Sequence, residues 1–182
     1  MKVVVISDIH GSKFYANKII EIMNNENPDK LILLGDLYYH GPRNPLTDEY
    51  NPGEVANILN SFKDKIIAIK GNCDAEVDEM ISEFKLNEYL EVEINNRKVF
   101  LSHGHKYNID SLPPVEFDIM IYGHFHMGFI HEENGMIFAN PGSISLPKNN
   151  TKNSYLVINE EKISLKDVNG EVIVEKGWIT IE

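Results

Sequence analysis

The hydrophobic positions in the first half of the chain fall into two kinds of segment. Three short runs are apolar on both faces, as buried parallel strands are, and three longer segments repeat their apolar residues with helical spacing. The runs cover residues 2–6, 31–34 and 66–69, and the helical segments cover residues 14–25, 53–62 and 76–84. This alternation of strands and helices predicts right-handed βαβ units around a parallel sheet.

The second half of the chain has shorter apolar segments separated by turn residues. The predicted strands are residues 89–94, 99–102, 118–122, 129–130, 136–139, 155–158, 162–166 and 171–181. Asn95-Asn96 and Asn134-Gly135 mark hairpin turns, so a mostly antiparallel arrangement is predicted here. The two halves predict an α/β sandwich of two packed sheets with helices outside, in one domain that covers residues 1–182.

Polar residues that can bind metals occur just past the carboxyl ends of the predicted strands. Seven of them share this placement: Asp8, His10, Asp36, Asn72, His103, His124 and His126. In open α/β sheets, ligands bind in the crevice beyond these strand ends, so the seven side chains should converge on one site. Alone, each has a simpler explanation as a helix cap, a turn residue or a surface histidine. Their repeated placement at equivalent positions favours a metal centre.

The chemistry of these seven side chains narrows the choice of metal. Carboxylate, imidazole and amide donors without a thiolate cluster suit Mn, Fe, Zn or Ni better than Ca or a structural zinc. Seven donors exceed the usual coordination of one ion and suit two ions about 3.5–4 Å apart that share one carboxylate. The sequence therefore predicts a dinuclear site, and we expect Mn to serve it best.

The composition restricts the partners and the location of the protein. A formal net charge of −11 opposes binding of long nucleic acids, although a small anionic substrate can bind where local cations offset the field. A single cysteine excludes an internal disulfide framework. No apolar run approaches the ~20 residues of a membrane-spanning helix, and no export signal is visible at the amino terminus. We therefore expect a cytoplasmic protein that binds no membrane.

The order of the motifs resembles one known family. The motifs are Asp-Ile-His at residues 8–10, Gly-Asp at 35–36, Gly-Asn at 71–72, His-Gly-His at 103–105 and Gly-His-Phe-His at 123–126. They resemble the calcineurin-like metallophosphoesterases. The segments HGPRNPL (40–46), GNCD (71–74) and NPGSISLPK (140–148) resemble the small YfcE-type phosphodiesterases of that superfamily. The resemblance implies a four-layer α/β/β/α fold and metal-dependent hydrolysis of small phosphodiesters.

The resemblance also implies a role for each of the seven side chains. One ion would be held by Asp8, His10, Asp36 and His126, and the other by Asp36, Asn72, His103 and His124. Asp36 would bridge the two ions and is therefore a candidate catalytic residue. A hydroxide between the ions would attack phosphorus in line with the leaving oxygen, so no protein nucleophile is needed.

Cys73 stands where many members of the superfamily have a histidine that protonates the leaving group. The thiol is interpreted either as a small buried hydrophobe behind the site or as an ineffective replacement for that acid. In the second case, the enzyme should favour diesters whose leaving group departs without help, such as nitrophenols. His105 is a candidate catalytic residue that supports the ligands from behind, whereas His40 and His131 have no argument beyond their position.

Two further residues are candidates for contact with the substrate. Arg43 lies in a long loop, residues 38–52, of the kind that is usually functional or disordered. Its guanidinium is interpreted either as a bidentate phosphate-binding group or as that of a surface arginine. Phe125 stands where the family usually has a small hydroxyl residue. It is interpreted either as simple packing or as an aromatic wall for an aryl or base leaving group.

Other functions and assemblies compete with this hypothesis. One alternative is a scaffold protein with this fold that resembles a retromer subunit. A scaffold does not need the metal-binding side chains, and this chain retains all seven candidates, which favours the enzyme. A nuclease acting on DNA ends is disfavoured by the acidic charge and the lack of a basic stripe. We expect a homo-oligomer, most simply a two-fold dimer, from the resemblance and from apolar residues of the closing strand: Ile173, Val174, Trp178 and Ile179.

Overall fold

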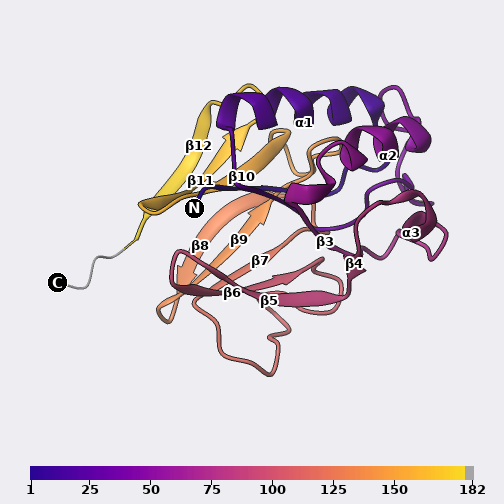
Figure 1. Cartoon of the computed structure of the whole chain (residues 1–182). Helices are drawn as coiled ribbons and strands as arrows, with labels where there is room; N and C mark the ends of the chain where they lie inside the picture. Colours follow the sequence, from indigo (N-terminus) through magenta and orange to yellow (C-terminus); the bar gives the residue numbers. More distant parts are fainter. Residues whose placement is uncertain (179–182) are drawn as a thin grey trace.

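The computed structural model describes residues 1–178, which form two β-sheets that face each other (Figure 1). The seven-stranded sheet contains β1 (Val3–Ile6), β2 (Lys30–Leu33), β3 (Ile66–Ile69), β4 (Leu86–Asn87), β10 (Ser154–Ile158), β11 (Lys162–Asp167) and β12 (Val172–Gly177). The five-stranded sheet contains β5 (Tyr89–Ile94), β6 (Arg97–Ser102), β7 (Ile119–Tyr122), β8 (Gly128–Glu133) and β9 (Met136–Pro141). The helices are α1 (Lys13–Glu26), α2 (Pro52–Asn60), α3 (Asp78–Ile81) and the 3₁₀ turn η1 (Lys63–Lys65).

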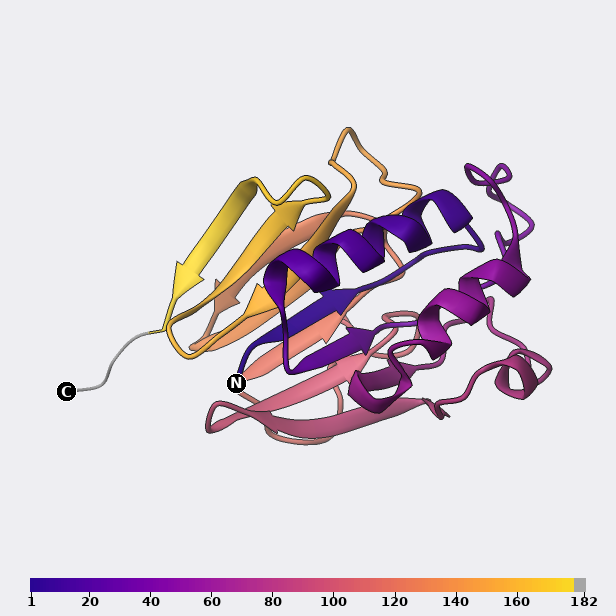
Figure 2. The same cartoon turned by 45° about the horizontal axis from the view of Figure 1, so that its top comes forward.

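The seven-stranded sheet has the order β12-β11-β10-β1-β2-β3-β4. Strands β1 to β4 are parallel, because α1 and α2 carry the chain back across the outer face of the sheet (Figure 2). The continuous apolar run of β1 is buried throughout, as a strand covered on both faces should be. The predicted βαβ units are therefore confirmed, and the closing strands β10, β11 and β12 extend the sheet in antiparallel fashion beyond β1.

The two long helices begin and end where local capping residues allow. The Ser12 side chain accepts a hydrogen bond from the backbone at the start of α1, and Asn27 ends that helix in a left-handed conformation with φ of 44°. Asn51 caps α2 in the same way, with Pro52 at the first helical position. Within residues 1–178, no helix is both long enough and apolar enough to cross a membrane.

The third predicted helix, residues 76–84, is wrong in length. Only α3 is helical, and none of its residues is buried, so no apolar face stabilises a longer helix. Ser82 already has an extended backbone, and the chain continues into the short edge strand β4, which the hydrophobic pattern did not predict.

The five-stranded sheet has the order β5-β6-β7-β9-β8 and is mixed. The hairpins β5–β6 and β8–β9 are antiparallel, as their turn residues predicted. In contrast, β6, β7 and β9 are parallel to one another. The second half of the chain is therefore mostly antiparallel, as predicted, with two parallel pairs within this sheet. The parallel pairing brings the carboxyl ends of β6 and β7 to one edge, beside those of β1, β2 and β3.

The two sheets enclose one apolar core, and aliphatic residues from both inner faces fill it. They include Val3, Val5, Ile32, Leu34, Leu101, Ile119, Ile121 and Leu156. The outer face of the five-stranded sheet is covered by residues 103–118, which contain no helix and pack around Phe100 and Tyr122. The four-layer order is thus present, with an irregular segment as its fourth layer.

The closing strand β12 lies at an edge of the seven-stranded sheet and is mostly exposed. Its Val172, Ile173 and Val174 are 52%, 43% and 38% exposed. Trp178 packs against the core between the sheets, and its indole donates a hydrogen bond to the Asn159 carbonyl. The predicted strand continued to residue 181, but Ile179 and the residues after it lie outside the described part of the chain.

Candidate metal centre

The site lies where strands of both sheets end. From the seven-stranded sheet, Asp8 and His10 follow β1, Asp36 follows β2 and Asn72 follows β3. From the five-stranded sheet, His103 follows β6, and the loop after β7 carries the other two ligand candidates, His124 and His126. Side-chain contacts of 3.0 to 3.7 Å link all seven predicted ligands into one group. Their convergence agrees with the prediction, although their roles as ligands stay predictions.

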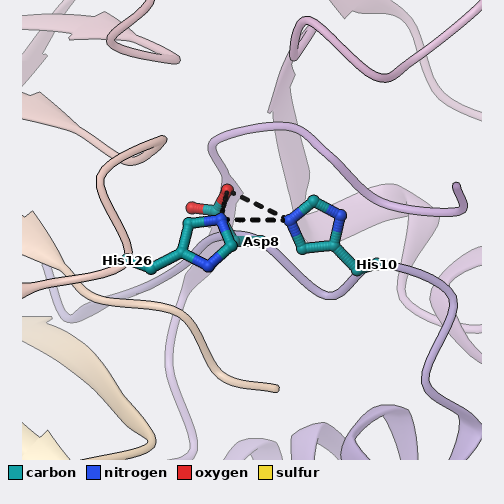
Figure 3. A group of neighbouring side chains, drawn as sticks. All are labelled: Asp8, His10 and His126. Atoms are coloured by element: carbon teal, nitrogen blue, oxygen red, sulfur yellow. Dashed lines mark hydrogen bonds and ion pairs between the residues drawn. The ribbon is translucent and has the colours of Figure 1, made fainter. Parts of the chain in front are cut away.

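The first half of the group is formed by Asp8, His10 and His126 (Figure 3). The Oδ1 atom of Asp8 lies 3.6 Å from Nε2 of His10 and 3.2 Å from Nε2 of His126. The two Nε2 atoms lie 3.2 Å apart. Asp8 Oδ1 is buried and no hydrogen bond reaches it, so this side of the carboxylate lacks a partner of opposite charge.

Backbone carbonyls determine which ring nitrogens carry protons. Nδ1 lies 2.9 Å from the Tyr39 carbonyl in His10, and 2.7 Å from the Leu146 carbonyl in His126. A carbonyl can only accept, so Nδ1 is the donor in each neutral ring. Both Nε2 lone pairs therefore point at each other and at a carboxylate. A shared cation relieves this repulsion, so the donor set fits a divalent metal.

The second half of the group is organised around Asp36. Its Oδ2 atom lies 3.7 Å from Nε2 of His10 and 3.4 Å from Nε2 of His103, between the two halves. His103 Nε2 is also 3.0 Å from Oδ1 of Asn72 and 3.3 Å from Nδ1 of His124. The His103 Nδ1 atom donates to the Leu34 carbonyl at 2.6 Å, which leaves Nε2 as the metal-facing atom. This arrangement suits a bridging carboxylate.

The pKa values of the buried carboxylates and imidazoles are shifted by one another's charges. Burial opposes the charged form of Asp8, but His10 and His126 outweigh it and lower the pKa of Asp8 well below its usual value. Burial disfavours an imidazolium, yet Asp36 and Asp8 raise the pKa of His103 to about 9. Burial and the neighbouring His103 lower the pKa of His124 to about 4. A proton on His103 thus takes the place of a cation, and a bound metal would displace it.

The backbone at the site is strained. Five of the seven ligand candidates are non-glycine residues in the left-handed region, with φ of 57° at Asp8, 50° at His10, 54° at Asp36, 66° at His124 and 60° at His126. Such conformations cost on the order of 1–3 kcal/mol each and persist only where the surroundings enforce them. Here, the two loops brace each other, since the His10 N–H donates to the Asp36 carbonyl at 2.9 Å.

Two glycines allow the backbone to approach the carboxylates closely. A Cβ atom added at Gly71 would overlap Asp36 Oδ1, and one added at Gly123 would overlap the Ser7 hydroxyl and Asp8 Oδ2. Only glycine fits at these two positions. The backbone of each turn therefore packs directly against the carboxylate of Asp36 or Asp8.

Asp74 was not recognised from the sequence as part of the site. Its buried carboxylate accepts three backbone hydrogen bonds of 2.8 Å, from Asp36, Leu37 and Gly71. It therefore fixes the turn that carries Asp36 against the turn that carries Asn72. Burial and the neighbouring Asp36 raise the pKa of Asp74 to about 6. An acid in a GNCD turn resembles an ordinary turn residue, and only its depth reveals this role.

Cys73 lines the cleft over the site and is only half-buried, which corrects the interpretation as a buried hydrophobe. Its sulfur lies within 4.8 Å of donor atoms of His10 and Asp36. Burial and the charge of Asp36 raise the pKa of the Cys73 thiol to about 12. In the metal-free protein, the group is therefore a neutral thiol.

The remaining candidates are spread around the site. His105 is exposed, with its ring 5.4 Å from that of His103. Phe125 packs against the Tyr122 ring and also lines the cleft, so both of its interpretations agree with its position. His40 and His131 do not line the cleft.

The cleft over the site has a volume of about 880 Å³. Its walls are the turn around Arg43, the turn around Cys73, the loop of His124 and His126, and the segment that contains Lys148. Arg43 thus lines the cleft, and its role in binding phosphate stays a prediction. Lys148 was not among the predicted residues. Its place in the cleft depends on the folding of residues 140–148 back toward His126, which the sequence pattern does not show.

Comparison with known proteins assigns the family. The model of the calcineurin-like phosphoesterase superfamily domain matches residues 1–162 of the chain. The chain belongs to this superfamily. The predicted family, fold and general class, a metal-dependent phosphoric diester hydrolase, are thereby confirmed.

Individual relatives agree with this membership. The chain is 37% identical over 177 residues to phosphodiesterase YfcE of Escherichia coli K12, which covers 96% of each chain. The solved structure of E. coli YfcE, described as a phosphoesterase, has a TM-score of 0.94 at 33% identity and covers 97% of this chain and 99% of its own. Vacuolar protein sorting 29 of Cryptosporidium parvum shares the fold, with a TM-score of 0.68 at 20% identity over 97% and 98% of the two chains.

Proposed function

We propose that this protein hydrolyses small phosphodiesters at a centre of two divalent metal ions, with Mn as the preferred ion. The observation that supports this most is the close approach of the His10 and His126 Nε2 atoms, 3.2 Å apart, beside the buried Asp8 Oδ1 atom, which has no hydrogen-bond partner. The likeness to YfcE of E. coli, named a phosphodiesterase, supports the reaction type. We infer a cytoplasmic enzyme from the single cysteine, since a chain with one cysteine has no internal disulfide framework.

The residues would divide between the two ions as the family pattern implies. Asp8, His10 and His126 would hold one ion, Asn72, His103 and His124 the other, and Asp36 would contact both. When bound, such ions lower the pKa of water and neutralise charge on the phosphoryl oxygens. The protein itself orients the imidazoles of His10, His103 and His126 through a carbonyl at Nδ1. It holds Asp36 through Asp74 and the Cys73 amide. Arg43 would bind a phosphoryl oxygen from the wall of the cleft.

The first test removes the metal. Protein treated with a chelator and freed of it should lose hydrolysis of bis(4-nitrophenyl) phosphate, and Mn should restore more activity than Zn, Fe or Ni. The reason is that no side chain at the site is placed as a nucleophile in place of a metal-activated water. Elemental analysis confirms that the treated sample is metal-free. Full turnover by that sample would show that the proposal is wrong.

Cys73→Ala should change turnover of the nitrophenyl diester by less than about threefold, against the 10²–10⁴-fold that a general acid contributes. The thiol is a weak donor, and nitrophenolate leaves without protonation. Cys73→His should instead raise turnover of a cyclic nucleotide selectively, because its ribose leaving group needs a proton. Both variants are compared at matched metal content. Loss of nitrophenyl diester hydrolysis in Cys73→Ala with metals still bound would make the thiol catalytic.

A scaffold function is not favoured, because the fold likeness to vacuolar protein sorting 29 at 20% identity concerns architecture alone. A role on long nucleic acids is opposed by the net charge of −11.

We also propose a two-fold dimer that uses the exposed edge strand β12. Val172, Ile173 and Val174 leave apolar surface at an unpaired strand edge, which a second copy can cover. Sedimentation velocity at micromolar concentration should give a dimer, and Ile173→Lys should shift it toward monomer. A monomeric wild-type protein at that concentration would contradict the dimer.

A further inference from the structure

The wall of the cleft carries positive charge that the chain does not neutralise. Within residues 1–178, four cationic side chains take part in no hydrogen bond, ion pair or ring contact: Lys13, Arg43, Lys85 and Lys148. Two of these, Arg43 and Lys148, line the cleft over the metal centre. Among the lining residues, the only carboxylate is the ligand candidate Asp36. The chain has 28 acidic and 17 basic residues, so two unpaired cations in one wall are unusual. Their positive charge favours the binding of an anion in the cleft.

The backbone at Lys148 is fixed relative to the metal centre. The Lys148 N–H donates to the His126 carbonyl at 3.0 Å, and His126 Nδ1 donates to the Leu146 carbonyl at 2.7 Å. The Thr151 hydroxyl donates to the Lys148 carbonyl at 2.7 Å and closes the turn. The ammonium is therefore held within one side-chain length of a turn that is bonded to a predicted metal ligand.

Arg43 lies in a second ordered turn across the cleft. The Asn44 side chain donates to the His40 carbonyl at 2.8 Å, and the Asn44 N–H bonds to the Gly41 carbonyl. A Cβ atom added at Gly41 would lie 3.1 Å from the sulfur of Cys73, so this turn passes close to the Cys73 side chain beside the metal centre. Both cations are thus carried by turns that are connected to the site.

A charge count shows that a simple phosphodiester does not need both cations. Two divalent ions with the carboxylates of Asp8, Asp36 and Asp74 leave one net positive charge, and the diester and the attacking hydroxide bring the total to one negative charge. One of the two cations balances that charge, and the other remains without a counter-charge. The cleft volume of about 880 Å³ leaves space for further substrate groups beyond the diester.

We propose that Arg43 and Lys148 form a subsite for a second phosphate group, so that the substrate is a compact phosphodiester that carries one more phosphate. This proposal rests on the proposed function and deepens it. It identifies Lys148 as a specificity-determining residue that binds the non-scissile phosphate as a point charge, with Arg43 as a forked donor opposite. Tyr39 and Phe125, which also line the cleft, offer faces for the organic part between the two phosphates.

The kinetic test uses two substrates that differ only in the second phosphate. These are thymidine 5′-(4-nitrophenyl phosphate) and its 3′-phosphorylated form, compared at one metal concentration and one ionic strength. Wild-type kcat/KM should be about tenfold higher on the phosphorylated substrate, as expected for a charge-assisted contact in a partly exposed site. Lys148→Gln should remove most of this preference, and Arg43→Gln should reduce it. Lys85→Gln, an unpaired lysine away from the cleft, is the matched control and should keep it.

A binding measurement separates the subsite from the hydrolysis. Calorimetry with thymidine 3′,5′-bisphosphate and thymidine 5′-monophosphate should show tighter binding of the bisphosphate, with the difference lost in Lys148→Gln and kept in Lys85→Gln. Lys148-dependent binding without hydrolysis would reject the proposed function and keep the subsite. Equal kcat/KM for the two substrates, or a preference that survives in both cleft variants, would overturn the subsite. A kcat/KM that rises steadily with oligonucleotide length would overturn it too, in favour of a nucleic-acid backbone.

Discussion

Asp36→Asn should lower kcat for nitrophenyl diesters by about 100-fold or more, since even groups that only support metal ligands are worth 10–100-fold. The Asp36 Oδ2 atom lies 3.7 Å from the Nε2 atom of His10 and 3.4 Å from that of His103. Replacing it with an amide removes the charge shared by both ions. Metal analysis should therefore find fewer than two tightly bound ions per chain.

The Asp36→Asn protein should still fold. The asparagine Oδ1 can keep the 2.8 Å bond from the Cys73 amide, and its Nδ2 can donate to the lone pairs on His10 or His103. The matched control is Asp64→Asn, on an exposed aspartate in the η1 turn, which should behave as wild type. Two tightly held ions and normal turnover in Asp36→Asn would contradict the bridging role.

Asp74→Ala should destabilise the metal-free protein by about 3–5 kcal/mol, because a buried donor left without a partner costs roughly 1–3 kcal/mol. The substitution removes the hydrogen-bond acceptor of three backbone N–H groups at once, those of Asp36, Leu37 and Gly71. Urea unfolding of the chelated protein measures this directly, with Asp64→Ala as the control. A change of less than about 0.5 kcal/mol, which is typical of an ordinary surface site, would contradict the role assigned to Asp74.

Asp74→Asn should fall between wild type and Asp74→Ala. An asparagine oxygen can accept from both Asp36 and Gly71, which share one carboxylate oxygen, but its Nδ2 would face the Leu37 N–H as a second donor. Because the turn would survive in distorted form, this variant should bind metal more weakly while remaining folded. An Asp74→Asn protein with wild-type metal affinity would limit Asp74 to a role in stability.

The sequence predicted the convergence of the ligand candidates better than it predicted the elements around them. The runs that became β1, β2 and β3 are continuous and apolar, so their ends could be located, and the ligand candidates follow those ends directly. Strands β6 and β7 pair in parallel across the long connection of residues 103–118, and β7 pairs with β9 across the intervening β8. Such pairing is a tertiary effect that local alternation does not encode. For the same reason, α3 was overestimated, since its apolar residues have nothing to pack against.

The sequence did not predict residues whose role depends on burial or on contacts between distant parts of the chain. Asp74 differs from a common turn aspartate only in being buried against three amides. Lys148 faces the cleft only because its turn is bonded to His126, some twenty positions earlier in the chain. Cys73 was noticed from its place in the motif, but its partial exposure in the wall of the cleft is a property of the folded chain that the motif does not encode.

The ligand candidates come from both sheets, so metal binding by them would couple metal supply to folding. Ions held between Asp8 and His10 on one sheet and His126 on the other would act as a clasp across the sandwich. A ligand that binds only the folded chain stabilises it by about 2.7 kcal/mol at a free concentration of 100 times its dissociation constant. The strained left-handed turns of the site are then maintained by the ions as well as by the chain. A cell that withholds the metal would therefore shorten the lifetime of this protein as well as silence it.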